Sequence, residues 1–407
     1  MGILDNQKFL FWAIVIDIFF LPYFNIIVIP LSYFLILIWV LNHYREIMSD
    51  WESRMVFVCM VLMFISTIWG SLDNYVYGVV GDNIKRLIQY YFVFGYYFFF
   101  KFYLKKNKVD LKKIFWFFVV FVVVLALIFQ SNISLFVRLS SIWNKGNAYN
   151  VEMVENADWG YTNRYNFIWT DTNNIAYAIT GIIMMLLIFC ITSLGEKLLL
   201  FALNVFVLFC CMSSGGWIGF AVSWSLYLFY AIHNGRLFSR YVDRKSLIIS
   251  IIVLGIFVVF ISKGYLSTFL QSDLVSAAMD RLENNEESRT DIWMRILNDE
   301  SIIKYLLIGK GSELYINGRS RAAHSGHLYW IYAYGCISYF IFMRKFFWIG
   351  ITNLKRYIPL ISFFLCFTMN TMVGEQKLFI ILILLICYLR EVDEDNGEIS
   401  KFNRSGI

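Results

Sequence analysis

Long apolar runs, separated by short polar or basic stretches, make up most of the chain as far as about residue 390. A bilayer core about 30 Å thick is crossed by about 20 apolar residues of helix. Runs of near that length occupy residues 55–72, 84–103, 114–130, 173–193, 246–263, 327–343, 356–372 and 376–390. This pattern predicts an all-α polytopic membrane protein.

Two further runs are too long for one helix each. Pro22 interrupts the first run and predicts helices at 9–21 and 24–41. The Ser and Gly residues at 213–216 interrupt the second run and predict two more helices. The total is about twelve spans. We expect them to form a single membrane domain over residues 1–407.

The distribution of charge gives an independent test of this topology. Only 16% of the residues are charged, against about 25% in soluble domains. With the amino terminus inside, most of the 35 basic residues fall in connections on the inner face. This positive-inside pattern predicts that both termini are cytoplasmic. Lys85, Arg86 and Lys377 are exceptions, since they lie in or beside outer connections.

Two long hydrophilic segments, 131–172 and 264–326, are both predicted on the outer face. Loops longer than about 12–15 residues are usually functional or disordered, and these two are rich in Trp, Tyr, Arg and Asn. In the second loop, residues 288–291 resemble a helix N-cap, and Gly309 and Gly311 follow the apolar spacing. An amphipathic helix is therefore expected there.

Two of the four histidines, His324 and His327, lie at the start of the run 327–343. Histidine suits general acid/base chemistry near neutral pH, although an interfacial role is equally compatible with the local sequence. No nearby carboxylate or cysteine stands at a metal-ligand spacing, so a base is favoured over a metal ligand. Nor does any P-loop, dinucleotide fingerprint or nucleic-acid-binding patch occur.

Arg289 lies at the start of the predicted amphipathic helix, where amide donors and a guanidinium together suit phosphate. The alternative is a solvated arginine paired with a nearby glutamate. Arg164 precedes a span, where arginine commonly anchors the interface. Asp17, Glu375 and Lys377 are ionisable groups in or beside spans. Such groups suggest function, but a polar partner on a neighbouring helix would also explain Asp17.

Three stretches together resemble the O-antigen polymerase and O-antigen ligase superfamily. They are Arg164 with Asp171–Ala176, Arg289-x-x-x-Trp293 leading to Ile308–Gly311, and His324-Ser325-x-x-Leu328 followed by Gly335 and Ser338. They occur in the family's order. The chain departs from the pattern at Ser214-Gly215-Gly216, where many members have an arginine, and at Thr172, where proline is usual.

The resemblance implies a GT-C-like fold and a metal-independent glycosyltransferase without cofactors, in the bacterial inner membrane, with its active site on the periplasmic face. His324 would act as the general base. Arg164 and Arg289 would hold pyrophosphate, and Arg319, Arg321 and His327 would contribute to substrate binding.

The implied reaction transfers a growing glycan from undecaprenyl pyrophosphate to a sugar hydroxyl of a lipid-linked repeat unit. The ligase reaction, with lipid A-core as the acceptor, is the alternative. A flippase or other transporter is a third reading, although such proteins often contain internal repeats, which this chain lacks. The implied partners are undecaprenyl pyrophosphate-linked oligosaccharides and membrane lipid, with room for a chain-length regulator protein and no role for nucleic acid.

Overall fold

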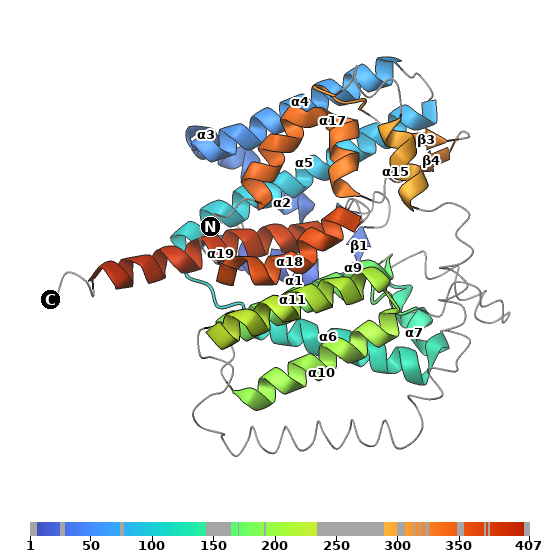
Figure 1. Ribbon diagram of the computed structural model, residues 1–407. Coiled ribbons are helices and arrows are strands. Elements are labelled where there is room, and N and C mark those ends of the chain that lie inside the picture. The colour runs from blue at the N-terminus through green and yellow to red at the C-terminus, as the bar shows by residue number, and fades with distance from the viewer. Residues whose placement is uncertain are drawn as a thin grey trace.

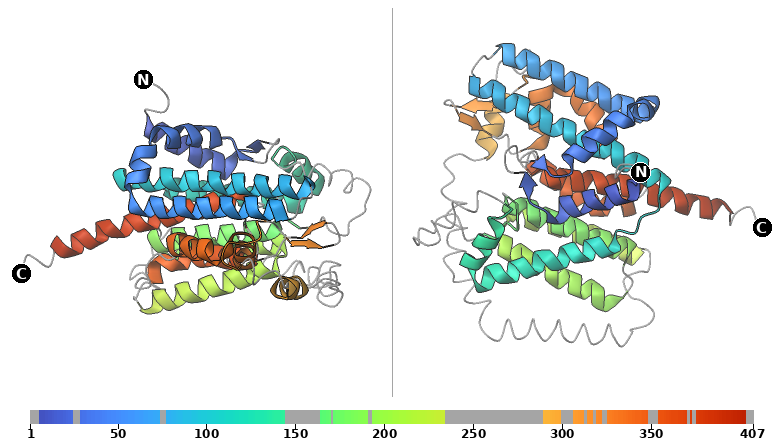
Figure 2. Two further views of the ribbon diagram at one scale, coloured as in Figure 1. Left: turned by 90° about the horizontal axis from the view of Figure 1, so that it is seen from above. Right: turned by 180° about the vertical axis from the view of Figure 1, so that it is seen from behind.

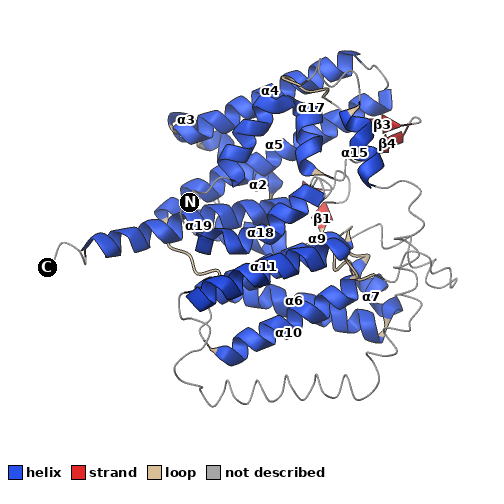
Figure 3. Ribbon diagram, in the orientation of Figure 1, coloured by secondary structure: helices blue, strands red, loops and turns tan. Residues whose placement is uncertain are grey.

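The computed structural model describes residues 6–24, 29–73, 77–143, 164–169, 171–190, 193–233, 289–298, 306–311, 314–316, 319–321, 325–347, 354–369, 372 and 375–402. These residues are mostly helical (Figures 1 and 3). In the first half of the chain the helices are α1 (Gln7–Phe20), α2 (Tyr33–Asn42), α3 (Tyr44–Ser49), α4 (Trp51–Asp73), α5 (Tyr77–Lys106), α6 (Lys112–Ser131), α7 (Ile133–Ser140) and α9 (Thr172–Phe189). They are followed by α10 (Leu194–Cys211), α11 (Ser214–His233), α15 (Arg289–Leu297), α17 (Gly326–Phe342), the π-helix η1 (Met343–Phe347), α18 (Leu354–Met369) and α19 (Gln376–Phe402).

Five helices, α4, α6, α9, α10 and α11, are long and apolar enough to cross a membrane. The sequence prediction of a helical membrane protein agrees with this finding. Twelve spans and an outer position for the two long loops stay predictions, and the predicted span 246–263 lies outside the described residues.

The predicted helix at 24–41 begins only at Tyr33. Before it, β1 (Tyr23–Phe24) and β2 (Ile29–Pro30) pair as a short antiparallel hairpin. Pro30 accounts for part of the difference, because the residue before a proline disfavours the helical conformation, and Ile29 with Pro30 forms β2. A second hairpin, β3 (Leu314–Ile316) with β4 (Arg319–Arg321), lies in the segment predicted as the second long loop.

Two helices form the centre of the bundle. Nearly every residue of α9 is buried, and so is α19 from Leu378 to Cys387. By contrast, α4 and α6 expose apolar side chains such as Ile65 and Phe117 on their outer faces. Such helices suit a lipid surround, whereas α9 and α19 contact only protein along these stretches.

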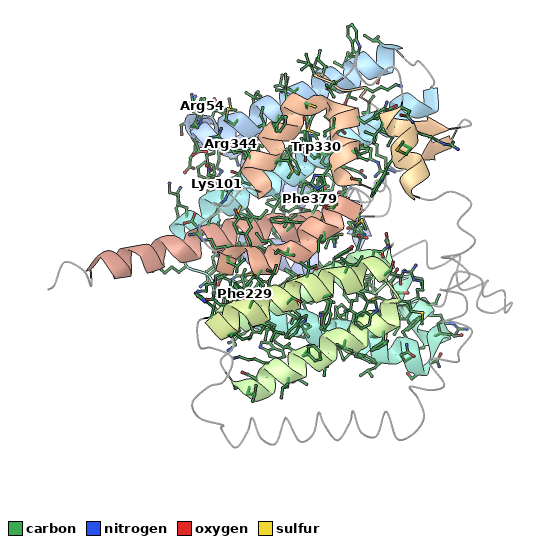
Figure 4. All side chains as sticks on the ribbon, viewed as in Figure 1. Arg54, Lys101, Phe229, Trp330, Arg344 and Phe379 are labelled. Carbon is green, nitrogen blue, oxygen red and sulfur yellow. The ribbon has the colours of Figure 1, made fainter. Side chains whose placement is uncertain are left out.

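The helices lie side by side, so the bundle has two ends (Figures 1 and 2). We name one the hairpin end, because both β-hairpins lie there together with the first residues of α9, α17 and α19. The opposite end is the basic end. There Lys101 pairs with Asp50 and Glu52, and Lys345 also pairs with Glu52. Figure 4 shows Arg54, Lys101 and Arg344 gathered at this end.

Candidate functional site

The predicted division of the second long run into two helices is confirmed, with the break at Met212–Ser213 rather than over 213–216, and Arg164 contacts this break. Helix α10 ends at Cys211, Met212 has a left-handed conformation with φ of 48°, and α11 begins at Ser214. The Nε of Arg164 donates to the carbonyl of Cys211 at 3.1 Å. A cation at the carboxyl end of a helix is favourable, because carbonyl groups there lack partners within the helix. Arg164 therefore lies at the hairpin end, against α10.

The start of α9 contacts the same break. Asp171 is the N-cap of α9 and accepts from the backbone N–H of Asn173 at 2.8 Å. The hydroxyl of Ser213 donates to the side-chain oxygen of Asn173. A Cβ on Gly215 would lie 2.6 Å from the hydroxyl oxygen of Tyr177. An arginine, which many members of the resembled family have in this stretch, would therefore require Tyr177 to move.

Helix α18 joins the start of α9 to the start of α17. Its Cys366 donates from Sγ to the side-chain oxygen of Asn174, at 3.6 Å. The next residue, Phe367, packs against Gly326 so closely that a Cβ there would lie 2.5 Å from the ring. Thr368 is 3.1 Å from Nε2 of His327. One turn of α18 thus brings two of the three motif stretches together.

His327 also joins the two halves of α17. Its Nδ1 is 2.9 Å from the hydroxyl of Tyr339, twelve residues further along, a separation of about 18 Å in a straight helix. The contact is made because Gly335, with φ of 79° and ψ of 165°, breaks α17 between them. Both ring nitrogens of His327 therefore have protein partners.

Residues 306–311 fill the break in α17. The backbone N–H groups of Lys310 and Gly311 donate to the carbonyls of Tyr332 and Ala333, each at 2.7 Å. In return, the N–H of Cys336 donates to the carbonyl of Leu306 at 2.7 Å. A broken helix within a membrane is tolerated where its freed backbone groups find such partners. We call residues 306–311 the inserted segment.

Three glycines allow the inserted segment to lie between α4 and α17. Gly309 and Gly311 have positive φ values of 89° and 66°. A Cβ on Gly311 would lie 2.0 Å from the carbonyl oxygen of Ser66, and one on Gly70 would lie 1.8 Å from that of Lys310. Ser66 lies seven residues before the end of α4, or about 10 Å along the helix. The sequence predicted that Gly309 and Gly311 end the amphipathic helix within an outer loop, and the structure shows backbone packed among helices.

A buried ion pair lies beside the first hairpin. The Nζ of Lys377 is 3.1 Å from Oδ1 of Asp17, and their side chains are 1% and 2% exposed. The same ammonium donates to the carbonyls of Asp17 and Leu21 at 2.7 and 2.6 Å. It also lies 4.8 Å from the centre of the Tyr23 ring, within cation–π range. The polar partner of Asp17 on a neighbouring helix is therefore Lys377, on α19.

The ion pair belongs to a wider polar network. Asp17 also accepts from the backbone N–H of Ser32 at 2.6 Å and from its hydroxyl at 2.5 Å. The Tyr23 hydroxyl donates to the fully buried Glu375. The Tyr33 hydroxyl donates to the side chain of Gln376. These bonds fix the hairpin and the start of α2 against the start of α19.

The remaining predicted site residues are placed less completely. Helix α15 contacts α17, and β4 pairs with β3 at the same end of the bundle (Figure 1). For the predicted site arginines on these two elements, the structure describes the backbone and not the side chains. These residues are Arg289, Arg319 and Arg321. His324 lies outside the described residues. The structure thus gives side-chain contacts for Arg164 and His327 among the predicted site residues.

Sequence reasoning missed the inserted segment and the extent of the buried network. The signals for the first were Gly309, Gly311 and Gly335, which suggest close backbone approach as well as helix ends. For the second, the signal was the presence of Asp17 and Lys377 in apolar surroundings.

Comparison with protein-family models gives no match for this chain, and comparison with curated proteins gives none either.

Proposed function

We propose that this protein is a membrane glycosyltransferase that polymerises a lipid-linked glycan. The growing glycan would be transferred from undecaprenyl pyrophosphate to a sugar hydroxyl of a lipid-linked repeat unit, on the periplasmic face of the bacterial inner membrane. Under this proposal the hairpin end of the bundle faces the periplasm, with about twelve spans in total.

The observation that supports the proposal most is the convergence of the three motif stretches. Asn174 and Gly326–His327 contact one turn of α18, and the inserted segment hydrogen-bonds to α17. These stretches are far apart in the chain. A reaction between two lipid-linked glycans needs groups for the leaving pyrophosphate and for the acceptor hydroxyl within one site.

The proposed chemistry uses side chains alone. The acceptor oxygen attacks the anomeric carbon, His324 takes the hydroxyl proton, and the bond from that carbon to the pyrophosphate oxygen breaks. Arg164 and Arg289 would stabilise the charge that develops on the departing undecaprenyl pyrophosphate. Arg319 and Arg321, on β4, would contact phosphate or the acceptor glycan.

Two other functions make use of the same features. A ligase would perform the same transfer to lipid A-core. A transporter would explain the broken α17 and the buried charges of Asp17 and Lys377, since discontinuous helices and interior charges are common in transporters. Deletion of the gene distinguishes the three functions. Loss of a polymerase leaves lipid A-core that carries one repeat unit, and loss of a ligase accumulates lipid-linked polymer. Loss of a flippase abolishes both of these products.

The site is tested with His324→Ala and Arg289→Ala in the deletion strain, with surface-glycan ladders and membrane abundance as the measurements. We expect each variant to lose at least about 100-fold in polymerisation, the scale of general acid/base and electrostatic contributions, at unchanged abundance. Arg295→Ala is the matched control, because Arg295 is an exposed arginine on the same helix as Arg289.

Near-normal ladders from both variants would refute the assignment of this site. Activity of the purified protein that is lost in EDTA and restored by a divalent cation would refute the metal-independent scheme.

A further inference from the structure

An apolar groove runs between α4 and α5, on the face of the bundle that exposes apolar side chains. It has a volume of about 420 Å³ and an almost wholly apolar lining. The lining includes Phe64, Ile68 and Leu72 on α4 with Ile84, Ile88 and Tyr91 on α5. Thr67 and Ser71 also line it. The hydroxyl of Thr67 donates to the carbonyl of Met63 at 2.9 Å within the helix, and the hydroxyl of Ser71 is buried without a hydrogen-bond partner in the described part of the chain. The groove therefore offers almost no polar group to a ligand.

The groove has the depth of one membrane leaflet. From Phe64 to Leu72 it follows α4 for about 12 Å, close to half of a hydrocarbon core about 30 Å thick. Its deep limit is near Tyr91, whose hydroxyl donates to the carbonyl of Met60 at 2.5 Å and joins the two helices. Its other limit lies toward the hairpin end, since α4 ends at Asp73.

A cation lies beside this groove. Lys85 is exposed and is adjacent in sequence to Ile84 and three residues from Ile88, both of which line the groove. Residues at such a spacing are neighbours on a helix surface. Lys85 is also an exception to the positive-inside pattern. Lys85 lies between Ile84 and Arg86 at the start of a predicted span, where a charged side chain commonly has a partner of opposite charge.

The groove adjoins the inserted segment. Gly70, on α4 between Ile68 and Leu72, lies directly against the carbonyl of Lys310. The ammonium of Lys310 is 5.4 Å from the centre of the Tyr332 ring, in the first half of α17. A lipid whose chain occupied the groove would therefore have its head group near the hairpin end, close to the motif stretches.

We propose that this groove binds the isoprene units nearest the phosphate of a polyprenyl phosphate or pyrophosphate, with Lys85 attracting the phosphate. The inference deepens the proposed function and rests on it, because it assigns the position of the lipid-linked substrate. The groove is a single furrow between two helices, which suits a lipid with one chain. Polyprenyl phosphates and phospholipids both carry phosphate, and the competition experiment below distinguishes them.

The experiment uses the full chain in nanodiscs and a photoreactive undecaprenyl phosphate that carries a diazirine. Ile68→Trp fills the groove and should lower labelling about tenfold. Ile65→Trp is the matched control, because Ile65 is on the same helix with nearly the same exposure, 46% against 45% for Ile68, but does not line the groove. We expect it to change labelling less than twofold. Lys85→Gln should lower labelling about threefold and make it less sensitive to salt.

Unlabelled undecaprenyl phosphate should compete with the probe, whereas phosphatidylglycerol at the same concentration should not. Equal labelling of Ile68→Trp and Ile65→Trp, or equal competition by phosphatidylglycerol, would overturn the inference. The measurement needs no glycan transfer. Labelling that behaves as expected in a protein without polymerase activity would therefore retain the groove and reject the proposed function. Ordinary polymerase activity, together with labelling that Ile68→Trp does not lower, would retain the proposed function and reject the groove.

Discussion

Lysine is used differently at the two ends of the bundle. At the basic end, Lys101 pairs with Asp50 at 2.5 Å, and the two side chains are 16% and 29% exposed. At the hairpin end, the side chains of Lys377 and Asp17 are 1% and 2% exposed. The first pair remains in contact with water, whereas the second has lost its hydration on both sides. Lysines at the basic end can therefore set topology, while Lys377 depends on its protein partners.

The comparison also distinguishes two roles of basic residues in a membrane protein, setting the topology and making a specific contact. Cations that follow the positive-inside pattern need no particular contact. A cation that departs from it needs a partner, and Lys377 has Asp17, three backbone carbonyls and the Tyr23 ring. Lys85, a second exception, lies beside the apolar groove. Basic residues that depart from the positive-inside pattern thus indicate where a specific contact of the cation is to be sought.

The largest effect is expected from removing the buried cation. Lys377→Met leaves the carboxyl group of Asp17 without its ion-pair partner, and breaking a buried pair costs about 3–5 kcal/mol. We therefore expect a large fall in the melting temperature of the purified protein in detergent. Lys101→Met is the control at the basic end and should cost no more than about 1 kcal/mol.

The double variant Asp17→Asn, Lys377→Met tests the cause of that loss. It removes both members of the ion pair and should recover much of the melting temperature lost in Lys377→Met. If Lys377→Met and Lys101→Met melted alike, the contrast between the two ends would be wrong.

The helices could be predicted well because each depends mainly on its own sequence. The run 114–130 corresponds to α6, and the run 55–72 corresponds to most of α4. The inserted segment could not be predicted in this way. Its hydrogen bonds join backbone groups more than twenty residues apart, and every residue except proline carries the same backbone donor and acceptor. Its glycines were recognised, but their partners are a property of the fold.

An intermediate effect is expected where the inserted segment meets α4. Alanine is usually favoured over glycine within a helix by about 1 kcal/mol, but the Cβ of Gly70→Ala would lie 1.8 Å from the carbonyl oxygen of Lys310. We expect a loss of about 2 kcal/mol or more as the segment is displaced. Gly81→Ala is the matched control on α5, because a Cβ there meets nothing within 4 Å.

The measurement is melting temperature together with limited proteolysis of the inserted segment. Gly70→Ala should melt lower and be cleaved faster, whereas Gly81→Ala should melt at the same temperature or slightly higher. A stabilised Gly70→Ala variant would mean that the segment does not occupy this position.

The candidate site was predicted in part. The motif stretches pointed to Arg164 and to the residues around His327, and α18 was not expected to join them. Cys366, Phe367 and Thr368 are ordinary residues of an apolar helix. Their importance comes from what they contact, which a linear pattern does not contain.

The smallest effect is expected at the basic end, and it depends on pH. Burial raises the pKa of Asp50, but hydrogen bonds from Lys101 and the N–H of Ser53 outweigh it and hold the pKa below its usual value. A lowered pKa in the folded state stabilises the protein above the unfolded value, about 3.9. This contribution is lost as the pH falls through the folded pKa. Asp50→Asn should therefore lower the free energy of unfolding at pH 7 by about 1 kcal/mol or less, and the difference from the unaltered protein should shrink toward pH 3. A difference that stayed constant over this range would show that Asp50 contributes through packing rather than charge, in which case the exposed pairs of the basic end would contribute to topology alone.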